Sequence, residues 1–122
     1  MSANGKTVLL VDDDTTNLET LGGILRAEGY TVLCARNGAE ALAILHAAHP
    51  DIMMVDYVMP HMDGATTIGA LKLEPDKQDI AIVMTSGLPE EVVRPRCSEY
   101  DAFLQKPIDI DRALRMLSAL GR

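Results

Sequence analysis

Acidic residues crowd the end of the first apolar run of the chain. The stretch KTVLLVDDDTT places Val8 to Val11 directly before Asp12, Asp13 and Asp14. Adjacent carboxylates repel one another, and burial of any of them adds a desolvation cost. A bound cation removes that repulsion, and Mg²⁺ prefers oxygen ligands of this kind. The cluster therefore predicts a site for a divalent cation.

Other polar side chains follow three later apolar runs. Asp56 follows IMMV, Thr85 and Ser86 follow IAIVM, and Lys106 follows FLQ. A carboxylate can act as a nucleophile toward phosphorus, while an ammonium and a hydroxyl can stabilise the phosphoryl oxygens. Brought together with the acidic cluster, these side chains suit phosphoryl transfer to an aspartate.

The elements that must position these residues are short strands alternating with helices. Apolar, β-branched runs predict strands covered on both faces at Thr7–Val11, Thr31–Ala35, Asp51–Val55, Ile80–Thr85 and Ala102–Gln105. The alternation predicts a doubly wound α/β fold, flavodoxin-like, with a parallel sheet in the common order 2-1-3-4-5. Ligands of such sheets bind where the order reverses, beyond the first and third strands. The three acidic positions at the ends of these strands are expected to converge there.

Helices are predicted from the spacing of apolar residues. The expected inward positions are Leu18, Leu21 and Leu25; then Ala41, Leu42 and Leu45; then, after Gly64, Ile68 and Leu71; and finally, from about Asp109, Ile110, Leu114 and Leu117. Asp14 is a natural cap for the first helix, and Asn37 with Glu40 resembles a capping box for the second. Gly22 and Gly23 are interpreted as allowing close packing on the sheet.

The segment between Ser86 and Lys106 departs from this regularity. It reads GLPEEVVRPRCSEYDAFLQ. Pro89 suits a helix start, but Pro95 falls inside the expected fourth helix, where it removes a hydrogen bond and clashes with the preceding turn. The sequence predicts a short, irregular or mobile fourth helix over residues 87–100.

Composition sets the class of protein. The 122 residues fit a single domain over 1–122 with a core of about 6–120, and a 48% apolar content without Trp predicts an aliphatic core. The net charge of −7 argues against general affinity for nucleic acid or anionic membranes. The chain shows neither a membrane-length apolar run nor a signal-peptide core, which favours a cytoplasmic protein with Cys34 and Cys97 as reduced thiols.

The motifs, taken in order, resemble a response-regulator receiver domain, the CheY-like module of two-component signalling. They are LLVDDD, PDIMMVDYVMPHMDG, IVMTSG and FLQKP, and the resemblance runs from Lys6 to about Leu120. It is strongest in the long motif, where Pro60 and Gly64 stand four and eight residues after Asp56. Such a domain is not an enzyme on other molecules; it catalyses only its own phosphorylation and dephosphorylation.

The resemblance implies a role for each acidic residue. Asp56 would accept a phosphoryl group from a sensor histidine kinase or a phosphotransfer protein. Asp13, Asp56 and the backbone carbonyl of Val58 would bind Mg²⁺ or Mn²⁺ directly. Asp12 would act through metal-bound water.

It also implies the remaining machinery. Lys106 would bridge to the phosphoryl oxygens, with a cis bond to Pro107. Ser86 is the preferred switch hydroxyl, with Thr85 as the alternative. Phe103 falls at the aromatic switch position.

Two departures from the family pattern predict altered behaviour. The usual dimer through helix 4, strand 5 and helix 5 becomes doubtful because helix 4 is interrupted. Apolar Val58 and Leu88 cannot orient an attacking water, which predicts slow loss of the phosphoryl group. His61, in the loop after Asp56, is interpreted as solvated.

Two rival functions stay open. Asp12-x-Asp14-x-Thr16 resembles the first motif of haloacid-dehalogenase-type phosphohydrolases, with Asp12 as nucleophile. That reading leaves Asp56 unexplained, and Asp109 and Asp111 stand at a helix start instead of forming a strand-end acidic pair. The other rival is a receiver-like binding module that does not use phosphate.

The chain carries no recognisable output segment. The initial Met favours a free-standing receiver that acts through protein contacts over a piece of a larger protein. The sequence specifies neither the kinase, the stimulus nor the downstream target.

Overall fold

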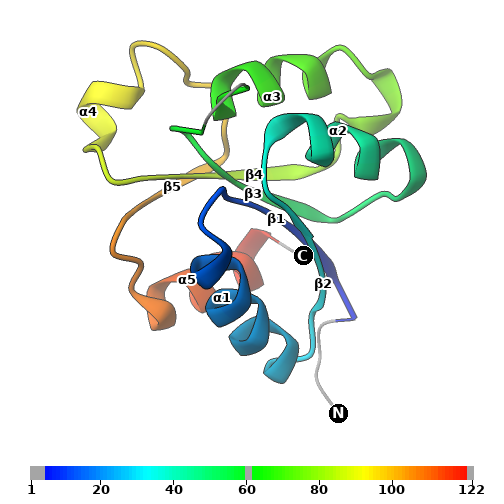
Figure 1. Ribbon diagram of the computed structural model, residues 1–122, viewed down its shortest axis with the longest axis vertical. Helices are drawn as coiled ribbons and strands as arrows, with labels where there is room; N and C mark the ends of the chain where they lie inside the picture. The colour runs from blue at the N-terminus through cyan, green and yellow to red at the C-terminus, as the bar shows by residue number, and fades with distance from the viewer. Residues whose placement is uncertain (1–4, 60–61, 121–122) are drawn as a thin grey trace.

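The computed structural model describes residues 5–59 and 62–120, and its centre is a parallel sheet of five strands (Figure 1). The strands are β1 (Thr7–Val11), β2 (Thr31–Ala35), β3 (Ile52–Asp56), β4 (Ala81–Ser86) and β5 (Ala102–Gln105). Their order is β2-β1-β3-β4-β5, which confirms the predicted topology. The order reverses between β1 and β3, so the ends of these strands form the predicted crevice.

Two strands lie one residue later in the chain than predicted. The Thr7 N–H donates to the Asp51 carboxylate (2.8 Å), which places Asp51 at the sheet entrance and not inside β3. The Ile80 N–H donates to the Lys77 carbonyl (3.3 Å), closing a short 3₁₀ turn at Pro75–Lys77 before β4 starts.

Five helices cover the sheet: α1 (Thr15–Ala27), α2 (Gly38–Ala47), α3 (Gly64–Lys72), α4 (Glu90–Val93) and α5 (Ile110–Leu120). Figure 1 shows α2 and α3 on one face, α1 and α5 on the other, and α4 at the end near β5. Each face has its own apolar cluster, with Leu9, Met53, Ile82 and Met84 toward α2–α4 and Val8, Leu10, Met54 and Val83 toward α1 and α5. Alternate residues of every inner strand therefore point to opposite layers.

The predicted caps are present. The Asp14 side chain accepts from the N–H groups of Thr16 and Asn17 at the start of α1. Asn37 accepts from the Glu40 N–H (2.8 Å), and the Glu40 carboxylate accepts from the Arg36 N–H (2.8 Å). The Glu40 contact lies one residue before the cap, so this is a displaced capping box.

The two helical glycines of α1 differ. Gly22 is buried on the side of α1 that faces Val32, as the close-packing interpretation requires. A Cβ at Gly23 would meet nothing within 4 Å, so packing does not explain that glycine.

The fourth helix is short, as predicted. α4 has four residues, Glu90–Val93, and the chain leaves helical geometry at the turn that contains Pro95. Within the described residues, no helix combines the length and apolar character needed to cross a membrane.

Candidate functional site

Three carboxylates converge at the carboxyl ends of β1 and β3. One oxygen from each of Asp12, Asp13 and Asp56 lies within 4.8 Å of the others. Asp12 and Asp56 are buried, and Asp13 is exposed. Oxygen donors at this spacing suit a hard divalent cation, and two of them lie in a poorly solvated position.

Backbone contacts hold the first carboxylate in place. The Asp12 N–H donates to the Ala35 carbonyl of β2 (3.1 Å), so this residue continues the ladder beyond β1. One Asp12 oxygen, Oδ1, accepts from the Asp14 N–H (2.9 Å). The other oxygen, Oδ2, faces the site.

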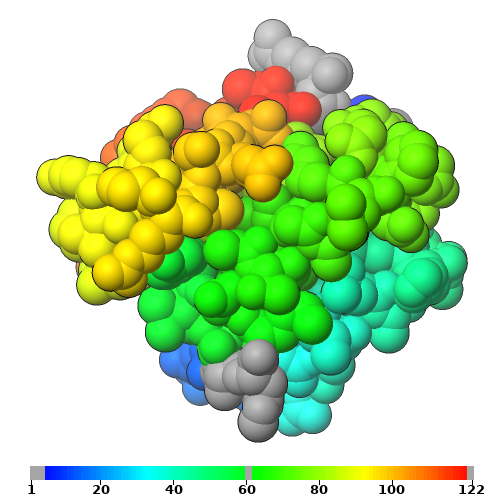
Figure 2. Space-filling view, turned by 90° about the horizontal axis from the view of Figure 1, so that it is seen from above, coloured from blue at the N-terminus to red at the C-terminus, as the bar shows by residue number. Residues whose placement is uncertain are grey.

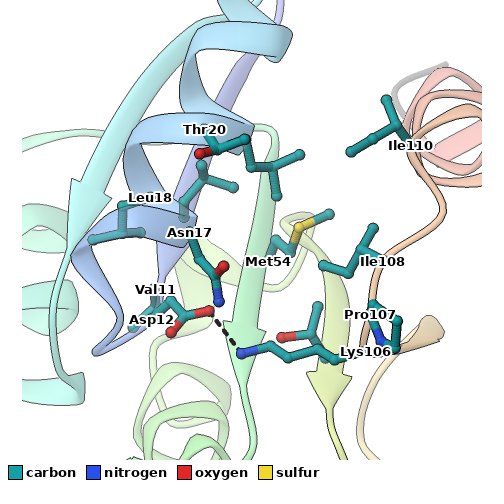
Figure 3. A pocket seen from close by; sticks show the side chains of 13 residues that line it. Val11, Asp12, Asn17, Leu18, Thr20, Met54, Lys106, Pro107, Ile108 and Ile110 are labelled. Carbon is teal, nitrogen blue, oxygen red and sulfur yellow. Dashed lines mark hydrogen bonds and ion pairs between the residues drawn. The ribbon is translucent and has the colours of Figure 1, made fainter.

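Lys106 connects two of the carboxylates. Its Nζ donates to Asp12 Oδ2 (2.9 Å) and to Asp56 Oδ2 (3.1 Å). Figure 3 shows the lysine reaching across from the end of β5 toward Asp12. The Lys106–Pro107 peptide bond is cis, and the Lys106 N–H donates to the Ser86 carbonyl (2.7 Å). The expected lysine–proline geometry at this site is therefore present.

The surroundings raise the pKa values of both Asp56 and Lys106. Burial raises the pKa of Asp56, and the charges of Asp12 and Asp13 raise it further, although Lys106 opposes them. Burial lowers the pKa of Lys106, but its hydrogen bonds and charge contacts with Asp12 and Asp56 outweigh burial and leave the pKa raised. Asp56 is thus an unusually basic carboxylate beside a firmly protonated ammonium.

The two candidate hydroxyls of β4 lie on opposite faces of the sheet. Thr85 pairs in register with Asp56, on the side of Val83 and the α1–α5 layer, and it lines the same cavity as Asp12 and Lys106. Ser86 is fully buried, and its Oγ accepts from the Leu88 N–H (3.0 Å). These positions favour Thr85 over Ser86 as the hydroxyl beside Asp56, and strand alternation is the sequence signal that indicates it.

The loop after β3 closes back on Asp56. The Gly64 N–H donates to the Tyr57 carbonyl (3.0 Å), and Asp63 caps α3 by accepting from the Thr66 N–H (2.8 Å). A Cβ on Gly64 would lie 2.5 Å from the Asp56 carbonyl oxygen. The path of this loop therefore requires a glycine at position 64, eight residues after Asp56. Pro60 and His61, also singled out in this loop, lie outside the described residues.

Gly64→Ala is expected to lower the free energy of unfolding by about 1–3 kcal/mol, because a methyl group there must displace backbone. Gly69→Ala is the matched control, since it lies in the same helix and a Cβ there meets nothing within 4 Å. The control is expected to raise stability by about 0.5–1 kcal/mol through helix propensity. Urea unfolding of both variants measures the difference, and equal effects would show that the loop adapts freely.

A cavity of about 230 Å³ opens next to the carboxylates, between α1 and the segment after β5 (Figure 3). Its walls are mainly apolar, from Leu18, Met54 and Ile108 among others. Asn17 of α1 lies close to the Asp12 end of the cavity in Figure 3. No sequence motif marks Asn17, because only the first turn of α1 brings it to this edge.

The remaining acidic candidates serve as helix caps. Asp14 caps α1, and Asp109 Oδ1 accepts from the Arg112 N–H (3.1 Å) at the start of α5. The phosphohydrolase reading needs Asp14 as an acid–base group, and a carboxylate already bound to backbone N–H groups fits that role poorly.

Two further predicted residues lie outside the carboxylate cluster. Phe103 is partly buried and packs against the apolar cluster between the sheet and α2–α4. Val58, two residues after Asp56, is exposed.

Comparison with known proteins agrees with this geometry. Residues 8–118 match the response regulator receiver domain family. The chain is 35% identical over 112 residues to the transcriptional regulatory protein GlrR of Escherichia coli, covering 91% of this chain and 25% of GlrR. It is 39% identical over 104 residues to the response regulator PleD of Caulobacter vibrioides, covering 84% and 23% respectively. The chain thus spans about a quarter of the length of these curated relatives.

Solved structures show the same fold. A receiver domain of a signal transduction histidine kinase from Syntrophus aciditrophicus superposes with a TM-score of 0.86 at 33% identity, covering 94% of this chain and 89% of that one. The response regulator TrrA of Thermotoga maritima, in complex with Mg²⁺ and BeF, gives a TM-score of 0.83 at 27% identity, covering 94% and 98%.

The fold and the acidic site together define a phosphoacceptor module of the doubly wound α/β class. The chain belongs to the response regulator receiver domain family of two-component signalling. Its acidic site, Asp12, Asp13 and Asp56, is the receiver site for phosphoaspartate and Mg²⁺.

Proposed function

We propose that this chain is a working receiver in which Asp56 takes a phosphoryl group from a phosphohistidine of a sensor kinase or phosphotransfer protein. The observation that carries the proposal is the Lys106 ammonium, bonded to both Asp12 (2.9 Å) and Asp56 (3.1 Å) beside the carboxylate cluster. A binding module without phosphate chemistry has no need to keep this costly arrangement. The domain is proposed to span the whole chain, with its core at about 6–120.

Transfer requires one bond to form and one to break at phosphorus. An Asp56 oxygen attacks, the phosphorus–nitrogen bond of the donor breaks, and the imidazole leaves with the electron pair and is then protonated. Burial makes the Asp56 carboxylate more basic and so a better nucleophile. Lys106 lies within hydrogen-bond distance of Asp56. Its positive charge can therefore stabilise the phosphoryl oxygens while the bond to Asp56 forms.

The carboxylates fit the cation that the family uses. Asp13, Asp56 and the Val58 carbonyl are proposed to bind Mg²⁺ or Mn²⁺ directly, with Asp12 acting through water. Two buried carboxylates and an exposed third supply the hard oxygen donors that either ion prefers. When bound, the ion neutralises charge on the phosphoryl oxygens.

Intact-mass measurement with acetyl phosphate and Mg²⁺ tests the function. We expect one added phosphoryl group, lost without Mg²⁺ and lost in Asp56→Asn. If no adduct forms and beryllofluoride also leaves the protein unchanged, the phosphate-independent module takes its place. Steady phosphate release that survives Asp56→Asn but not Asp12→Asn would establish the phosphohydrolase.

The hydroxyl that assists transfer is proposed to be Thr85, which the sequence offers as the alternative to Ser86. Thr85→Ala is expected to slow phosphorylation by acetyl phosphate about tenfold, because a donor to the phosphoryl oxygens is lost. Ser86→Ala is expected to keep the rate and to lower stability by about 1 kcal/mol, because it leaves the Leu88 N–H without its acceptor. Reversed effects in the two variants would restore Ser86 to the role.

Loss of the phosphoryl group is proposed to be slow. Val58 is 59% exposed beside the site and Leu88 is 37% exposed, and neither side chain can hydrogen-bond an attacking water. Val58→Asn is expected to speed hydrolysis about tenfold by orienting that water. Val92→Asn, an exposed apolar position on α4, is the matched control and should leave the decay of the phosphorylated mass unchanged. A wild-type decay as fast as that of Val58→Asn would contradict the argument.

The output is proposed to be a change in protein contacts. The net charge of −7 disfavours nucleic acid or anionic membrane as a direct partner of this chain. Four residues of α4 offer little surface for the usual dimer through α4, β5 and α5, so that dimer is not part of the proposal.

A further inference from the structure

The outward face of α2 and α3 carries almost no charge. Asp, Glu, Lys and Arg make up 24% of the chain, yet α2 and α3 contain only Glu40 and Lys72 of these types. The exposed positions of α2 hold one histidine and three alanines: His46, Ala39, Ala43 and Ala47. Figure 2 looks onto this face, with α3 in green at its centre and α2 in cyan to teal beside it. A helix that faces water normally presents charged side chains, whereas charged residues are depleted in the centre of a protein interface.

A cavity of about 200 Å³ opens between α2 and α3, and we call it the α2–α3 cavity. Leu45 and Leu71 line it and are buried, and its charged lining residues are Glu74 and Lys77. A cavity of about 150 Å³ already admits a ring of six carbon atoms, so this one has room for a leucine side chain. The cavity lies near the carboxyl ends of both helices, which run antiparallel to the strands. It is therefore at the opposite end of the sheet from Asp56.

One leucine stands exposed directly beside this cavity. Leu73 is the C-cap residue of α3 and is 81% exposed, more than any other large apolar side chain of residues 5–59 and 62–120. It lies between Leu71 and Glu74 in the chain, and both of these line the cavity. In two copies related by a two-fold axis, a protruding side chain next to a cavity can enter the cavity of the other copy, and the contact is then made twice.

The charges around Leu73 are complementary to themselves under such a two-fold axis. Lys72 precedes Leu73, and Glu74 follows it. When Leu73 enters the cavity of a second copy, Lys72 is brought toward the Glu74 that lines that cavity, and the symmetry repeats the pair. Opposite charges at the rim of an interface favour this orientation of the two copies over others.

We propose that the face formed by α2 and α3 binds a second copy of this chain, with Leu73 of each copy filling the α2–α3 cavity of the other. A second copy fits better than a different protein, because the protruding side chain, the cavity and both charges of the pair lie on this one surface. The interface is distinct from the usual one through α4, β5 and α5. It also leaves the carboxylate site uncovered and does not depend on phosphate chemistry.

Sedimentation equilibrium at about 10–500 μM protein tests the interface, because a small contact associates weakly. The wild type should shift from monomer toward dimer over this range. Leu73→Asp should raise the dissociation constant about tenfold or more, because a charge would have to enter an apolar cavity. Urea unfolding verifies that the variant is folded, as expected for an exposed position.

Val92→Asp is the matched control for this experiment. Val92 is an exposed apolar residue of α4, outside the face formed by α2 and α3, so its variant should associate like the wild type. A wild type that stays monomeric over the whole range overturns the proposal. A dimer that Val92→Asp disrupts and Leu73→Asp does not would place the interface at α4 and overturn it as well.

Exchange of two charges distinguishes a second copy from any other occupant. Lys72→Glu sets like charges against each other in both symmetric pairs, and we expect the dissociation constant to rise about fivefold. Adding Glu74→Lys to the same chain restores opposite charges in both pairs and should return the constant to within about twofold of wild type. If the double variant stays as weak as Lys72→Glu, then Lys72 does not face Glu74 of a second copy and the proposed arrangement is wrong.

Discussion

Replacing Lys106 by Met should have the largest effect of any single substitution in the site. We expect Lys106→Met to lower the free energy of unfolding by about 3 kcal/mol at neutral pH, because two buried carboxylates lose their shared partner. Met retains the apolar stem of the lysine, so packing is largely preserved and the loss is electrostatic. Phosphorylation by acetyl phosphate should slow by about a hundredfold or more, because the Lys106 ammonium that stabilises the phosphoryl oxygens is absent.

Urea unfolding with and without Mg²⁺ checks the first part. Mg²⁺ should stabilise Lys106→Met more than the wild type, because the ion replaces the missing positive charge. Lys77→Met is the matched control: the Lys77 side chain is also largely covered, but its Nζ lies 3.5 Å from an exposed carboxylate, Asp76. Solvent screens such a pair, which contributes about 1 kcal/mol or less. Equal stability of Lys106→Met and wild type would mean that the ammonium does not compensate the carboxylates.

The site could be predicted from sequence because two simple regularities coincide. Apolar runs that end in Asp12, Asp56 and Lys106 mark strand ends, and the topology of doubly wound sheets brings those ends together. The long motif with Gly64 then has a physical reason, since a Cβ at Gly64 would strike the Asp56 carbonyl. The preference for Ser86 over Thr85 neglected strand alternation, which places Asp56 and Thr85 on one face of the sheet.

Features that depend on irregular chain paths were beyond sequence reasoning. Pro95 indicated that α4 would be interrupted, and the structure confirms this, but nothing in the sequence indicated what holds the remaining turn. Tyr100 bonds to Glu90 ten residues earlier, across a turn with no periodic pattern. The contact between Gly38 and Thr67 is of the same kind: a Cβ on Gly38 would collide with the threonine hydroxyl, which only the packing of α2 on α3 reveals.

Asp56→Asn should make the protein more stable while it abolishes phosphorylation. Without Mg²⁺ at neutral pH we expect a gain of about 1–2 kcal/mol, because a buried charge near Asp12 and Asp13 is removed and Lys106 keeps its 2.9 Å bond to Asp12. Asp76→Asn, an exposed carboxylate, is the control and should change stability by less than about 0.5 kcal/mol. A loss of stability in Asp56→Asn would mean that Lys106 more than offsets the burial of Asp56.

The pH dependence gives the sign of this effect independently. The pKa of Asp56 is raised by folding, so between its ordinary value and its folded value the native state binds more protons than the unfolded chain. Stability therefore falls as pH rises through that window, and above it the full cost of the charge remains. Urea unfolding from acid to neutral pH should show this fall in the wild type and not in Asp56→Asn. Mg²⁺ should reduce the dependence of the wild-type unfolding free energy on pH, because the bound ion offsets the negative charge of Asp56. It should leave the curve of Asp56→Asn nearly unchanged. The same buried charge makes Asp56 costly to the fold and useful as a phosphoacceptor.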